Sequence, residues 1–159
     1  MSDHVERITT HIESLWTPET STLPQRWSNR TLEGHAIGQG VVSALVLRDW
    51  LGGKLVECLR ITDRSESLHV YNSLYDGKLI VDMTKRYRRV DEELLVNMRT
   101  ADPLSLLERY KALHDPYQAL GSAMLERLAP EEPRFAVDVS ELGIVMAAPN
   151  RAAMPPTVS

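Results

Sequence analysis

Two groups of residues have the types and the order that proton transfer or nucleophilic chemistry requires. The first is the turn Gly38-Gln39-Gly40, which leads directly into an apolar segment. The second is a histidine, His69, followed thirteen residues later by Asp82. A carboxylate that accepts a hydrogen bond from one ring nitrogen fixes a histidine's tautomer, so the other nitrogen can move protons. The start of a helix adds backbone N–H groups, which stabilise a thiolate or an oxyanion.

The position of His69 relative to Asp82 depends on a hairpin predicted between residues 68–74 and 79–84. The dipeptide Asp76-Gly77 separates these two strand-like runs and is a strong hairpin signal. With that two-residue loop, His69 lies opposite Thr84 and diagonal to Asp82, roughly 7–8 Å away at the backbone. Side chains can close this gap, so we expect a hydrogen bond between them. Asn72 points to the opposite face of the ribbon.

The other segments predict an α+β protein with a single domain over residues 1–148 and a loose C-terminal tail over 149–159. Apolar residues recur at helical spacing between residues 5 and 16. Residues 41–51 are apolar on nearly every face and end at Gly52-Gly53, which indicates a buried central helix. Residues 17–38 are predicted to form a long loop, and residues 54–60 a further strand. The C-terminal half is expected to be helical, at residues 91–98, 102–113 and 115–128, with two short strands at 135–139 and 142–148.

Composition and charge narrow the class of function. The 159 residues are 43% hydrophobic and 25% charged, as is ordinary for a globular domain. A net charge of −4 argues against a nucleic-acid or membrane-surface binder. The sequence has no apolar run long enough to span a membrane and no apolar signal region at its start. A single cysteine, Cys58, excludes an internal disulfide and fits a cytoplasmic protein.

No metal or cofactor is expected. The other four histidines lack metal-ligand spacing relative to one another or to the cysteine, and neither a Walker loop nor a dinucleotide fingerprint is present. A basic cluster over residues 85–89 could bind a phosphate or a carboxylate, but a solvated charged surface is the favoured interpretation.

Four short motifs in a shared order resemble the YunG-like family, a bacterial group with a papain-like or transglutaminase-like appearance. The family pattern reads approximately Gly-Gln-Cys-x-x-Thr-Ala-Leu-Val, Gln-Asp-aromatic-x-Gly-Gly, His-x-x-Asn and Asp-Leu-Thr. The matching segments here are residues 38–46, 48–53, 69–77 and 82–84. Weaker similarity around Trp16, Trp27 and residues 107–113 extends the resemblance over about residues 5–125.

The resemblance implies a papain-like or transglutaminase-like core, with the central helix starting near Gly40 and packed on a small antiparallel sheet. It also implies Cys-His-Asp/Asn chemistry. Carried over, His69 would be the base, Asp82 its orienting partner with Asn72 as a second candidate, and Gln39 an oxyanion donor. The cysteine position falls on Gly40, which has no side chain, so the thiol that covalent catalysis requires is missing.

Three functions remain open at this stage. A cleft that keeps His69 and Asp82 could perform non-covalent acid–base chemistry on a small molecule, such as cyclisation, elimination or isomerisation. A pseudoenzyme that binds a ligand or a protein without chemistry is the alternative. Residual acyl transfer through Ser43, which matches the family threonine, is the third, although a hydroxyl there more readily bonds the helix backbone. Cys58 is better explained as a small buried hydrophobe.

Overall fold

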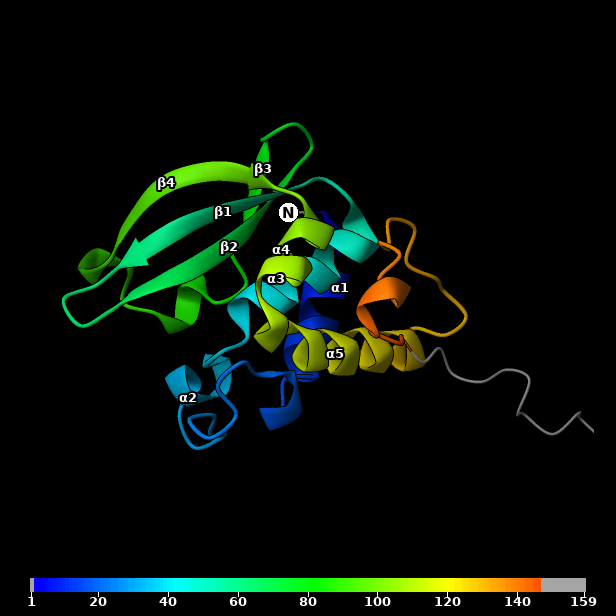
Figure 1. Ribbon diagram of the computed structural model, residues 1–159, viewed down its shortest axis with the longest axis horizontal. Coiled ribbons are helices and arrows are strands. Elements are labelled where there is room, and N and C mark those ends of the chain that lie inside the picture. The colour runs from blue at the N-terminus through cyan, green and yellow to red at the C-terminus, as the bar shows by residue number, and fades with distance from the viewer. Residues whose placement is uncertain (1, 147–159) are drawn as a thin grey trace, which may run out of the picture.

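The fold is built around helix α3 (Gly40–Leu51), which has both its faces buried. The computed structural model describes residues 2–146. Helices α1 (Asp3–Ser14) and α5 (His114–Arg127) pack against α3, and strand β2 contacts it as well. Figure 1 shows these helices on one side of the sheet, with the opposite sheet face open. Burial of apolar side chains around α3 is therefore the main force that fixes its position.

The sheet has four antiparallel strands in the order β3-β2-β1-β4. The strands are β1 (Lys54–Ile61), β2 (Glu66–Leu74), β3 (Leu79–Val81) and β4 (Leu94–Ala101). The predicted α+β class is thus observed, with a small antiparallel sheet packed on a central helix. In β2 the alternate residues 70, 72 and 74 are buried, and the Asn72 side chain donates a 2.9 Å hydrogen bond to the backbone oxygen of Ala44 in α3.

The hairpin register agrees with the sequence prediction. Asn72 pairs with Val81 and Leu74 with Leu79, which is the alignment that the Asp76-Gly77 loop predicts. The ladder ends at the Leu74–Leu79 pair, and residues 75–77 all have positive φ, so the turn is wider than two residues. Strand β3 also stops at Val81, three residues earlier than predicted. Asp82 and Thr84 therefore lie in the segment that follows the strand.

The helix predicted at residues 91–98 is wrong. A short 3-10 turn (Val90–Glu92) is followed by β4, which pairs with β1 at the edge of the sheet. The acidic residues 91–93 resemble a helix start, and the following apolar residues fit either period. Pairing with the free edge of β1 decides in favour of a strand. A register shift in this ladder accompanies the positive φ of Asn97.

The rest of the C-terminal half is partly as predicted. Helix α4 (Pro103–Arg109) has Asp102 as its N-cap, and a 3-10 turn (Lys111–Leu113) leads into α5. The two short strands expected at 135–139 and 142–148 are absent from the described residues up to 146, where the chain is irregular apart from a 3-10 turn (Ser140–Leu142). Residues 147 and 148 and the predicted tail lie outside the described residues.

The loop before α3 is more structured than predicted. It contains a 3-10 turn (Pro18–Thr20) and the short helix α2 (Leu32–Ala36). Gly38 has a φ of 71°, and a Cβ there would lie 2.3 Å from the Ser21 hydroxyl oxygen. Only glycine fits this close approach, so Gly38 lets the loop return against itself immediately before α3 begins.

Candidate active site

His69 and Asp82 are in direct contact, as the hairpin register predicts. The His69 Nε2 atom lies 2.9 Å from Asp82 Oδ2. Both side chains are largely buried, with 7% and 10% of their side-chain surfaces exposed. His69 reaches this position from β2, and Asp82 from the residue that follows β3. The hairpin therefore holds a histidine–carboxylate pair at one end of the sheet.

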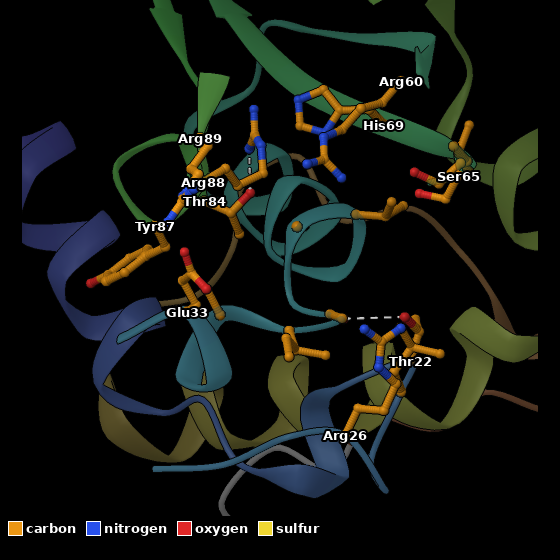
Figure 2. A pocket seen from close by; sticks show the side chains of 18 residues that line it. Thr22, Arg26, Glu33, Arg60, Ser65, His69, Thr84, Tyr87, Arg88 and Arg89 are labelled. Carbon is orange, nitrogen blue, oxygen red and sulfur yellow. Dashed lines mark hydrogen bonds between the residues drawn. The ribbon is translucent and has the colours of Figure 1, made fainter. Parts of the chain in front are cut away.

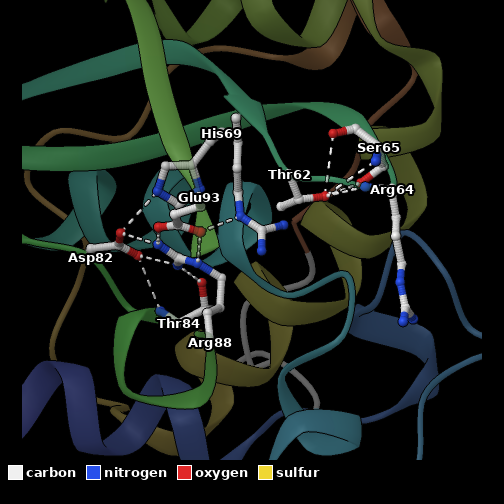
Figure 3. Close-up of polar contacts among 9 residues, drawn as sticks. Thr62, Arg64, Ser65, His69, Asp82, Thr84, Arg88 and Glu93 are labelled. Carbon is white, nitrogen blue, oxygen red and sulfur yellow. Dashed lines mark hydrogen bonds and ion pairs between the residues drawn. The ribbon is translucent and has the colours of Figure 1, made fainter. Parts of the chain in front are cut away.

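Arg88 makes the pair into a larger charged network, drawn in Figure 3. Its guanidinium donates to both oxygens of Asp82, at 3.0 and 2.9 Å, and also to Glu93 at 2.9 Å. Arg60 donates to the same Glu93 carboxylate from β1. Two arginines and two carboxylates thus form a network whose formal charge balances around the histidine.

The network fixes the charge of its members. Burial opposes the ionisation of Asp82, but hydrogen bonds from His69 and Arg88 outweigh it and hold the pKa of that carboxyl well below its usual range. Burial likewise opposes the charge on Arg88, but hydrogen bonds to Asp82 and Glu93 raise its pKa above the ordinary value. The pKa of Glu93 is lowered because Arg88 and Arg60 outweigh the cost of its burial.

The anionic state of Asp82 determines the tautomer of His69. A carboxylate can only accept a hydrogen bond, so the proton in the 2.9 Å contact belongs to His69 Nε2. In the neutral ring, Nδ1 then carries the lone pair. No side chain or backbone group among residues 2–146 forms a hydrogen bond with Nδ1. This nitrogen is consequently free to act as a base.

A cleft of about 580 Å³ lies beside this histidine. Its lining includes His69, Thr84 and the first two residues of α3, Gly40 and Val41. In Figure 2, His69 and Arg60 lie on the sheet side of the cleft, and Arg26 lies across it on the loop before α3. A Cβ added to Gly40 would lie 3.4 Å from Thr84 Oγ1, which is ordinary contact. The start of α3 and the histidine thus face a common space.

Three other predicted site residues do not reach this cleft. Gln39 is fully buried, and its side-chain amide bonds to Thr17 and Thr20 rather than to the cleft. Ser43 is also fully buried, where its Oγ accepts a 2.8 Å hydrogen bond from the Trp16 indole. The Asn72 side chain points to α3, as the alternation predicts, so it does not orient His69.

Cys58 lies directly opposite His69 in the β1–β2 ladder, and it is buried. Burial raises the pKa of its thiol, and the charges of Asp82 and Glu93 raise it further. A thiol in this environment is a poor nucleophile. Cys58 therefore serves as a small buried side chain, in agreement with the sequence interpretation.

Sequence reasoning missed the residues that complete the network. The basic cluster at residues 85–89 was expected to be a solvated surface, but only 12% of the Arg88 side chain is exposed. The sequence predicts a helix around Glu93 and indicates no role for Arg60. The only sequence signal was that a basic residue, Arg88, follows Asp82 by six residues.

A family model described as YunG protein matches residues 4–129. The chain belongs to the YunG family. The match spans α1 to α5 and includes the cleft, the hairpin and Arg88. No curated protein and no solved structure matches the chain.

The fold adds two further observations on the class of site. No helix of residues 2–146 has both the length and the apolar character needed to cross a membrane. Within the same residues, no three side chains of histidine, cysteine, aspartate or glutamate gather in a way that could hold a metal ion.

Proposed function

We propose that this YunG-family protein catalyses non-covalent acid–base chemistry on a small molecule in the cleft beside Gly40. His69 Nδ1 would take a proton from a carbon or hydroxyl of the bound molecule and return it to another position or to a leaving group. Cyclisation, elimination and isomerisation all follow this scheme. The observation that carries the proposal is the His69–Asp82 hydrogen bond, which leaves Nδ1 free beside an open cleft.

The absence of a nucleophile supports a non-covalent route. In the proposed papain-like or transglutaminase-like ancestry, a cysteine would stand at the start of α3, where this chain has Gly40. Ser43 is unsuited to replace it, because its hydroxyl is buried and held by Trp16. General acid–base assistance typically contributes about 10²–10⁴-fold to a rate, so it can support an activity without a covalent intermediate.

The test is a search for conversion that depends on His69. The protein is incubated with a small-molecule extract in D₂O, and mass spectrometry follows three changes: loss of water, a shift in retention at constant mass, and deuterium uptake. We expect at least one compound to change with the wild type and to change at least 100-fold more slowly with His69→Gln. His4→Gln is the matched control, because His4 is exposed and does not line the cleft.

A ligand-binding protein without chemistry is the second candidate. It is favoured by the bidentate contact between Arg88 and Asp82, which would hold the hairpin end together even if His69 moved no proton. The same extract distinguishes the two. A binder would enrich a compound on the immobilised protein without converting it, and His69→Gln would retain that enrichment.

A further inference from the structure

The charged groups around the cleft contrast with the charge of the whole chain. The protein carries a net charge of −4, yet the side chains that line this cleft include four arginines and a single carboxylate, Glu33. The charge of Arg60 is neutralised by an ion pair with Glu93, and that of Arg88 by ion pairs with Asp82 and Glu93. That leaves two other arginines, at positions 26 and 89, to act on a molecule in the cleft.

These two arginines are not committed to strong partners. The Arg26 side chain has no hydrogen bond or ion pair with any of residues 2–146. Arg89 forms an i,i+3 contact with Glu92 at 3.4 Å, and both side chains are largely exposed. Exposed pairs of this kind contribute little energy, so a ligand anion can compete with Glu92 for Arg89.

The start of α3 provides backbone donors in the same cleft. The N-cap residue Gln39 makes no side-chain cap, because its amide is bonded to Thr17 and Thr20. The Ser43 N–H donates to the backbone oxygen of Gln39, which is the first hydrogen bond of the helix. The N–H groups of Gly40 and Val41 have no hydrogen-bond partner among the described residues. An uncapped start on a twelve-residue helix favours a negative charge.

The His69 side chain presents a hydrogen-bond acceptor beside the same cleft. His69 is only 5% exposed, and its side chain lines the cleft. Its Nδ1 atom has no hydrogen-bond partner within residues 2–146. The lone pair on Nδ1 is therefore available to accept a hydrogen bond or a proton from a molecule in the cleft. The absent side chain at Gly40 leaves room beside the helix start for a small group.

We infer that the cleft takes a small molecule with a carboxylate or phosphate group, seated on the Gly40 and Val41 N–H groups between Arg26 and Arg89. This inference names the substrate class of the proposed active site and so rests on the proposed function. The anionic group would fix the molecule, and the part that loses a proton would face His69 Nδ1. We call this site, formed by the Gly40 and Val41 N–H groups with Arg26 and Arg89, the anion seat. Binding there requires no covalent bond to a nucleophile.

The probes are inorganic phosphate and succinate, titrated separately against the labelled protein while amide resonances are followed by NMR. Sodium chloride at equal ionic strength is the control. We expect the Gly40 amide, identified by its loss in Gly40→Ala, to shift saturably with at least one of the two probes. Preference for succinate or for phosphate then assigns the group as a carboxylate or a phosphate. A Gly40 amide that responds to neither probe beyond the chloride control overturns the inference.

Matched variants test whether the seat is specific. Arg26→Gln and Arg89→Gln should each weaken probe binding about two- to fivefold, as expected for one partly exposed charge, whereas Arg64→Gln should not. Arg64 is the control because it is exposed and does not line the cleft. Equal weakening by all three would mean that only net charge matters, and would overturn the inference.

A second pair of variants separates charge from volume at position 40. Gly40→Asp and Gly40→Asn fill the same space, but only the aspartate places a negative charge at the start of α3. We expect phosphate or succinate to bind at least fivefold more weakly to Gly40→Asp than to Gly40→Asn. Identical affinities would contradict an anion seat at this helix start.

Failure of the inference and failure of the proposed function give different results. Probe binding at Gly40 without any His69-dependent conversion leaves the anion seat in place and removes the acid–base proposal. Conversion of a neutral compound that depends on His69, with no probe binding, does the reverse.

Discussion

Placing a thiol at residue 40 tests whether the start of α3 and His69 have the geometry of a reactive site. The variant is Gly40→Cys. Its Cβ would lie 3.4 and 3.6 Å from Thr84 side-chain atoms, which is normal contact, so the fold should tolerate it. The native Cys58 is 4% exposed and its pKa is raised by burial, so it should give little background labelling.

The expected shift follows from the local charges. A free thiol titrates near 8.5, so about 3% is thiolate at pH 7. An uncapped helix start contributes about 0.3–1 kcal/mol, or up to roughly 0.7 of a pKa unit. A nearby exposed arginine adds a few tenths of a unit, so the pKa of the new thiol should fall to about 7.5. Arg88 adds little, because Asp82 and Glu93 already neutralise it.

The pH profile is a better measurement than the rate at one pH. At pH 7 the thiolate fraction would rise about eightfold, but each thiolate would react about threefold more slowly because nucleophilicity falls with pKa. The net gain of about two- to threefold is too small to decide. The alkylation rate is therefore recorded from pH 5 to 10, and the midpoint is compared with that of Thr10→Cys, an exposed position within α1.

We expect a midpoint near 7.5 for Gly40→Cys and near 8.5 for Thr10→Cys. Adding His69→Gln should raise the Gly40→Cys midpoint if the ring reaches the thiolate. A Gly40→Cys midpoint within about 0.3 unit of the Thr10→Cys value, unchanged by His69→Gln, would refute the reasoning, since neither the helix start nor the histidine would then act on that position.

Three further outcomes follow from buried polar groups. Arg88→Met should lower the free energy of unfolding by about 1.5–3 kcal/mol in urea melts, because it removes charged hydrogen bonds from two buried carboxylates and leaves Asp82 with His69 and Glu93 with Arg60; a loss below about 0.5 kcal/mol would contradict this. Burial raises the pKa of Asp49 from 3.8 to about 7, against opposing effects of Tyr117, Arg48 and the Val137 backbone. The folded state then binds more protons than the unfolded state between these values, so stability should fall as pH rises from about 4 to 8, by up to about 4 kcal/mol, and Asp49→Asn should flatten that fall. Ser43→Ala should cost about 1–3 kcal/mol of stability by orphaning the buried indole N–H that it accepts, while turnover per folded molecule stays within twofold; a large loss of turnover would restore Ser43 as a candidate nucleophile.

The parts of the site that could be predicted from sequence are those set by short-range rules. The Asp76-Gly77 turn and the two-residue period of strands fix the hairpin register, and that register brings His69 to Asp82. The central helix is equally local, since an apolar run with a double-glycine stop predicts it. Position 40 at its start followed from the same pattern.

The parts that could not be predicted depend on contacts distant in sequence. Residues 94–101 fit both helix and strand periods, and only the free edge of β1 decides between them. Arg60 and Glu93 meet because β1 and β4 are neighbouring strands. A sequence prediction that makes this segment a helix therefore cannot predict the charged network. The resemblance implies an oxyanion role for Gln39, but two contacts with the preceding loop turn its amide away from the cleft.

Arg88, whose contact with Asp82 is not predicted from the sequence, changes the role that Asp82 can have. A free carboxylate stabilises an imidazolium, which is what a thiolate–imidazolium pair requires. Here Asp82 already accepts two hydrogen bonds from Arg88, so its charge is largely compensated and it stabilises a cationic ring less than a free carboxylate would. What remains is orientation: the proton stays on Nε2 and the lone pair stays on Nδ1. An oriented base beside exposed arginines suits the removal of a proton from an anionic molecule. The charged network and the absent side chain at Gly40 thus favour the same non-covalent chemistry.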